Sequence, residues 1–124
     1  MSAPFVVFLR GEGWEARWLA ASAALSAAAL GAEVRLALFG EALRLFVAGR
    51  FDEGEPEAAR AIGAAGLTTQ LSDARAALPL RVVACDTALR LAGLDAARAV
   101  PPLDGIVSLP ELVRAAREGS SASF

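Results

Sequence analysis

Short apolar runs alternate along the chain with longer segments in which apolar residues recur at helical spacing. The runs are rich in Val, Leu and Phe and carry few polar positions, which is typical of strands buried on both faces of a parallel sheet. We predict such strands over residues 5–9, 34–39, 80–84 and 105–107.

The segments between these runs predict helices, most of which end at a glycine or a proline. We place them at residues 14–30, 41–48, 56–65, 72–78, 87–92 and 96–100, with a last helix ending near residue 118. Ser108 and Glu111 have the spacing of a capping box before this last helix. Residues 67–71 fit neither pattern clearly.

Strands that alternate with helices imply βαβ units, and therefore a three-layer α/β/α sandwich with a mostly parallel central sheet. The length of 124 residues suits one domain, which we place at residues 1–118. Residues 119–124 carry serines and no helical pattern, so we predict a flexible C-terminal tail.

The carboxyl ends of the strands are where open α/β sheets form their sites. This rule nominates residues 10–14, 39–42 and 85–87, together with Ser108. The candidate nucleophile is Cys85, the one cysteine of the chain. The candidate supporting or pocket-lining residues are Asp86, Thr87, Gly40, Arg10 and Gly11.

The composition excludes most other kinds of catalytic and binding site. The chain has no His, Lys, Tyr or Asn, so Ser-His-Asp and Cys-His arrangements, Schiff bases and a Walker lysine are excluded. A single cysteine excludes an internal disulfide and a cysteine metal cluster. The net charge of −2 is scattered and forms no basic patch for nucleic acid. We expect no metal and no cofactor.

Two interpretations of Cys85 follow from its position. A free cysteine after a buried strand is often a small apolar core residue. A cysteine between a strand and a helix N-terminus instead lies where free backbone N–H groups and the helix dipole favour an anion. Asp86 either caps that helix or opposes a thiolate with its negative charge. The sequence leaves the choice between these interpretations open.

The segment RVVACDTALRLAGL resembles the cysteine segment of the DsrE/DsrF/TusD-like sulfur-relay family. The similarity extends over most of the chain. The segment GAEVRLALFGEALRLFVAG precedes the cysteine segment and DGIVSLPELVRAA follows it, in the order typical of that family. The resemblance implies a small α/β protein that forms trimers or hexamers. In its sulfur-transferring members a cysteine at this position carries a persulfide, and only Cys85 maps onto that role.

We therefore expect a sulfur carrier or sulfurtransferase-like subunit that receives sulfur from a donor protein and passes it to an acceptor protein. The alternative is a non-catalytic oligomeric or small-ligand-binding module in which Cys85 is structural. Asp86 departs from the neutral residue that the family pattern favours.

Features outside the cysteine segment favour structural roles. The sequence Gly11-Glu12-Gly13 begins a nucleotide-binding pattern that Ala16 leaves incomplete, so an ordinary turn is favoured. The acidic residues at 52–57 indicate a solvated loop rather than a metal site.

The first helix has no charged residue from position 18 to its end. Trp14 and Trp18 share one face of it, which indicates either core packing or a subunit interface. We predict a homo-oligomer with the first helix at an interface, because an outer helix that is apolar all round needs a partner. The uncharged stretch is too short to span a membrane, and we expect a cytoplasmic protein.

Overall fold

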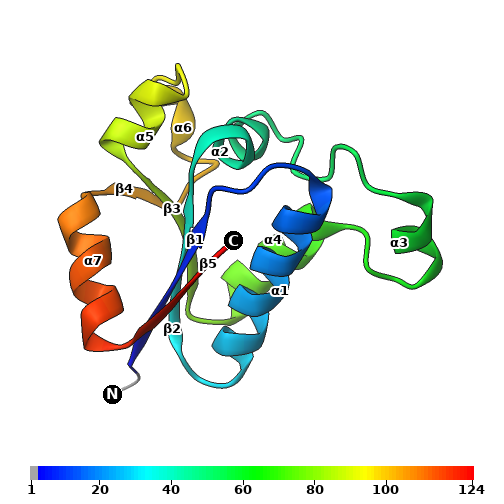
Figure 1. Cartoon of the computed structure of the whole chain (residues 1–124), viewed down its shortest axis with the longest axis horizontal. Helices are drawn as coiled ribbons and strands as arrows, with labels where there is room; N and C mark the ends of the chain where they lie inside the picture. Colours follow the sequence, from blue (N-terminus) through cyan, green and yellow to red (C-terminus); the bar gives the residue numbers. More distant parts are fainter. Residues whose placement is uncertain (1–2) are drawn as a thin grey trace.

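The computed structural model describes residues 3–124, in which strands and helices alternate (Figure 1). Every strand pair in the sheet is parallel, and the strand order is β4-β3-β2-β1-β5. The sheet is thus parallel throughout, where the sequence predicted a mostly parallel one. The strands are β1 (Pro4–Leu9), β2 (Glu33–Leu38), β3 (Leu80–Cys85), β4 (Gly105–Val107) and β5 (Ser120–Ser123).

Helices cover both faces of this sheet, which confirms the predicted three-layer architecture. Helices α1 and α4 lie on one face, α7 lies on the other, and α2, α5 and α6 gather near the carboxyl ends of the strands (Figure 1). The helices are α1 (Trp14–Ala29), α2 (Gly40–Val47), α3 (Glu57–Ala61), α4 (Leu67–Ala77), α5 (Asp86–Leu91), α6 (Ala96–Ala99) and α7 (Leu109–Glu118).

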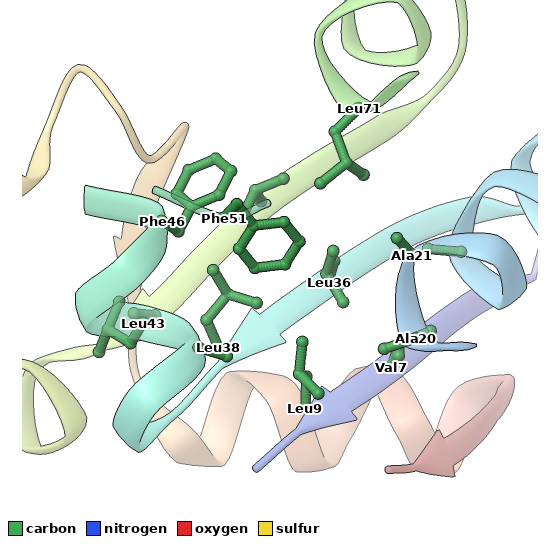
Figure 2. Close-up of a cluster of buried hydrophobic side chains, with 14 of the residues drawn as sticks. Val7, Leu9, Ala20, Ala21, Leu36, Leu38, Leu43, Phe46, Phe51 and Leu71 are labelled. Atoms are coloured by element: carbon green, nitrogen blue, oxygen red, sulfur yellow. The ribbon is translucent and has the colours of Figure 1, made fainter. Parts of the chain in front are cut away.

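The larger hydrophobic core lies between the sheet and the α1 side of the molecule (Figure 2). Alternate strand residues such as Leu36 and Leu38 point into it, and small residues such as Ala20 and Ala21 line the facing side of α1. Alanine leaves little side chain between the helix and the strands, so the Ala-rich first helix packs close to the sheet.

The smaller core lies between the sheet and α7. Val6, Ala37 and Val83 point from the strands toward Leu112 and Ala115 of that helix. The strands are therefore buried on both faces, which explains why their sequences are nearly continuous in apolar residues.

Helix α4 begins earlier than the sequence predicted. It starts at Leu67 instead of Ser72, because the carboxylate of Asp52 accepts hydrogen bonds from the backbone N–H groups of Leu67 (2.7 Å) and Thr68 (3.1 Å). This capping residue stands in a distant loop, so no local pattern in the sequence signals the start of the helix.

The predicted flexible tail is wrong at residues 120–123, which form strand β5 and pair with β1. The backbone N–H of Phe124 donates to the carbonyl of Phe8, and the N–H groups of Arg10 and Gly11 donate to the carbonyl of Phe124. The strand is held by backbone hydrogen bonds and not by apolar side chains, which is why the sequence pattern gives no sign of it.

A buried arginine anchors the loop between α2 and α3. Arg17 on α1 is 2% exposed, and its Nε donates to the carbonyl of Phe51 at 2.8 Å. Its other guanidinium nitrogens donate to the carbonyl of Glu53 and, at 3.0 Å, to the carboxylate of Glu41. The same Glu41 oxygen accepts the N–H of Gly13 at 2.9 Å. One side chain thus joins α1, α2 and the loop.

Candidate functional site

Cys85 is the last residue of β3, and α5 begins at the next residue. The thiol therefore lies at the carboxyl end of a central parallel strand, as the sequence predicted. Cys85 is also the N-cap of α5, and its Sγ accepts the backbone N–H of Ala88 at 3.3 Å. The residue is 6% exposed. The sulfur thus accepts one backbone N–H, and the residue is largely shielded from solvent.

Asp86 does not cap the helix, because Cys85 occupies the cap position. Its carboxylate instead pairs with Arg90 one turn further along α5, with Oδ2 and Nη2 3.0 Å apart. Both side chains are exposed. The spacing of four residues favours this pair and was visible in the sequence. The charge next to the thiol is thus balanced by a neighbouring cation at the surface.

A cavity of about 420 Å³ opens beside Cys85. Asp86, Thr87 and Ala88 line it from α5, Phe39 lines it from the end of β2, and Ser108 lines it from the end of β4. Three strand ends thus contribute to one cavity, as expected for a parallel sheet. Its volume lies within the usual range for small-molecule sites.

The remaining predicted residues lie outside the lining of this cavity. Gly40 follows Phe39 and begins α2 with a φ of 56°, a conformation that favours glycine. Arg10 and Gly11 follow β1, where their N–H groups bind the carbonyl of Phe124. Their backbones hold strand β5, so the structure gives these two residues a structural contact.

The opening of the cavity is apolar, which the sequence analysis did not foresee. Leu91 at the end of α5 is 83% exposed and lines the cavity together with Leu109 and Pro110 of α7. These residues come together only because α5 ends and α7 begins at the same edge of the sheet. Exposed leucine side chains around a buried thiol form a surface that suits contact with another apolar surface.

Ser108 belongs to the predicted capping box. Its Oγ accepts the backbone N–H of Glu111 at 3.2 Å, and α7 begins at the next residue. This bond fixes the start of α7, and with it the position of Leu109 at the opening. The role of Ser108 at the cavity is therefore to place a helix.

An ion pair fixes the strand next to β3. The carboxylate of Asp104 accepts two hydrogen bonds from Arg75, at 2.7 and 2.9 Å, and one from the N–H of Val82 at 2.7 Å. Burial opposes the charge of Asp104, but the bonds from Arg75 and Val82 and the charges of Arg75 and Arg81 outweigh it. They hold the pKa of Asp104 below its ordinary value of 3.8.

Within residues 3–124, no three Cys, Asp or Glu side chains lie close enough together to hold a metal ion. The helices of the same region are all too short or too polar to cross a membrane.

A scan against protein-family models finds no match, and no curated protein matches the sequence. Among solved structures, the YchN protein from E. coli is similar over 100% of both chains, with a TM-score of 0.65 and 18% sequence identity. This similarity supports the predicted resemblance to the DsrE-like family at the level of the fold. The chain therefore shares the α/β fold of YchN.

Proposed function

We propose that this protein is a sulfur carrier subunit in which Cys85 holds a persulfide and passes its outer sulfur to a partner protein. The observation that carries the proposal is the position of Cys85 at the end of β3, as the N-cap of α5 and in the wall of a cavity. The DsrE-like fold adds support, since that fold is associated with sulfur relay.

The proposed transfer needs no oxidant and no reductant. The Cys85 thiolate attacks the outer sulfur of a donor persulfide, a new S–S bond forms, the old one breaks, and the donor leaves as a thiolate. An acceptor thiolate then attacks the outer sulfur on Cys85, forms a new S–S bond and releases the Cys85 thiolate. Each step is a thiol exchange, which a chain without His, Lys or a second cysteine can perform.

The surroundings of Cys85 suit a sulfur anion in transit. The Ala88 N–H points at Sγ from 3.3 Å, and Arg90 balances the charge of Asp86 at the surface. The cavity provides space beside the thiol for the additional sulfur atom and for an approaching cysteine side chain. The exposed Leu91 and Leu109 at its opening offer a contact surface for the protein that carries that cysteine.

The competing role for Cys85 is a small apolar residue that completes the core. Its low exposure and its bond with Ala88 favour this alternative. Incubation with a low-molecular-weight persulfide, followed by mass spectrometry of the intact chain, separates the two roles. The carrier gains one sulfur atom, which a thiol reductant then removes, and Cys85→Ser gains none. A folded protein whose thiol gains no sulfur and resists alkylation contradicts the carrier role.

The opening of the cavity supplies a second test. Leu91→Ala removes an exposed side chain at the entrance, so we expect faster alkylation of Cys85 with unchanged stability. Ile62→Ala is the matched control, because Ile62 is 80% exposed and lies at the end of α3, outside the lining of this cavity. Equal alkylation rates in the two variants would contradict access through this opening.

We also propose a homo-oligomer, a trimer or a hexamer, with α1 at an interface. From Leu19 to its end, the outward side of α1 carries the exposed residues Leu19, Ser26 and Ala29, followed by Leu30, and no charge. Light scattering at several protein concentrations tests this assembly, and Leu19→Glu is expected to weaken it. A monomer at all concentrations contradicts it.

A further inference from the structure

A second cavity, of about 570 Å³, lies at the opposite end of α1 from Leu30. Trp14 and Trp18 line one side of it, and Pro56, Ala59 and Ile62 of the α3 segment line the other. We call it the tryptophan groove. It shares no lining residue with the cavity beside Cys85, so the inference is independent of the proposed sulfur transfer.

The two indoles of the groove are stacked, with centroids 6.4 Å apart and planes at 12°. Trp14 is buried beneath, and Trp18 is half-buried. The indole N–H of Trp14 is buried without an acceptor in the part of the chain that the structure describes, which is costly and unusual in a folded protein. Across the groove, Ile62 is 80% exposed. Aromatic and aliphatic side chains thus face each other with no protein between them.

The charged side chains that line the groove are all acidic. Glu12 and Glu15 are exposed and line it, and no arginine does. Over residues 3–124, neither glutamate lies within ion-pair distance of an arginine. Aromatic faces and carboxylates both attract a cation.

The two walls are held in place by bonds already described. Arg17 binds the carbonyls of Phe51 and Glu53, and Asp52 caps α4, so both ends of the α3 segment are anchored beside α1. Arg60 on α3 also pairs with Glu55 at 2.7 Å. A groove formed before binding loses little freedom when a ligand enters.

We propose that the tryptophan groove binds a small quaternary ammonium ligand. Apart from the two carboxylates and the indoles, the lining has no polar side chain. A primary ammonium or a guanidinium would bring several N–H donors, for which the two carboxylates are the sole acceptor side chains of the lining, and the apolar wall would leave the remaining donors unpaired. A quaternary ammonium has none, and its methyl groups fit against the Trp18 and Ile62 side chains.

The tryptophan fluorescence of the protein reports on this groove alone, because Trp14 and Trp18 are the two tryptophans of the chain and there is no tyrosine. Choline is the probe. Its control is dimethylbutanol, in which a carbon atom replaces the ammonium nitrogen. We expect a saturable change of emission with choline and binding at least about fivefold weaker with the neutral alcohol.

Separate variants then remove the two carboxylate charges and the Trp18 indole ring. Glu12→Gln combined with Glu15→Gln is expected to weaken choline binding about fivefold, and Trp18→Leu about twofold to fivefold. Glu33→Gln is the matched control, because Glu33 is exposed and begins β2 at the other edge of the sheet. It leaves binding unchanged.

Three results overturn the proposal: no saturable response to choline, equal affinity for choline and the alcohol, or unchanged affinity in the glutamine variants. Analytical ultracentrifugation of the same samples adds a fourth. If the tryptophan emission follows self-association and choline has no access to the associated form, the groove belongs to a second copy of the chain.

Discussion

Replacing Arg17 by methionine tests whether one buried side chain holds the loop that carries α3. Methionine has a similar length and fills the space without charge. The change removes three hydrogen bonds, to the carbonyls of Phe51 and Glu53 and to the carboxylate of Glu41. It also removes the guanidinium from above the Phe51 ring, 5.9 Å from its centroid.

The expected loss of unfolding free energy depends on how buried the partners are that remain without the arginine. Arg17 is nearly fully buried, while its partner Glu41 is one-third exposed. Removing one partner of a buried ion pair costs about 3–5 kcal/mol. Because Glu41 regains some water, we expect a loss near the lower end, about 3 kcal/mol. That is a large part of the 5–15 kcal/mol typical of a whole domain.

Urea unfolding followed by far-ultraviolet circular dichroism measures this loss. Arg44→Met is the matched control, since Arg44 is exposed on α2 and a surface change is worth within about 0.5 kcal/mol. If Arg17→Met unfolds at purification temperature, Arg17→Lys keeps a charge for Glu41 and is expected to lose less. A loss below about 1 kcal/mol for Arg17→Met refutes the reasoning.

Two further changes test the sheet. Asp104→Asn is expected to cost about 2 kcal/mol at neutral pH, because it weakens the charged bonds with Arg75. Since the folded pKa of Asp104 lies below 3.8, its stabilisation is present above that pH and is lost as the pH falls through the folded pKa. The variant should therefore show a shallower loss of stability in acid, and an unchanged acid slope would contradict this. Gly119→Ala places a Cβ 1.8 Å from the carbonyl oxygen of Pro4, so chemical denaturation should show a clear loss that Ser121→Ala does not; equal midpoints would count against a tight approach.

The strands could be predicted because burial on both faces leaves a direct mark on the sequence. The runs at residues 5–9 and 80–84 became β1 and β3 with ends shifted by one residue, and β4 matched its prediction. The same reasoning placed Cys85 at a strand end. An apolar run of this kind is local, so each strand can be predicted from its own residues.

The elements that the sequence missed depend on distant partners. Helix α4 starts at Leu67 because of Asp52, and β5 exists because β1 offers an unpaired edge. The importance of Arg17 was also invisible, since an arginine in a first helical turn normally reaches solvent. At the candidate site, the apolar opening around Leu91 depends on where α5 ends and where α7, a separate helix, begins.

The position of β5 has a consequence for the order of folding. Its pairing joins Phe5 to Ser120, so almost the whole chain must be closed into a loop before the contact forms. Closing long loops is entropically costly, and parallel pairing across them is slow. We therefore expect β5 to dock after the rate-limiting step. Substitutions in β5 would then accelerate unfolding and leave the refolding rate nearly unchanged.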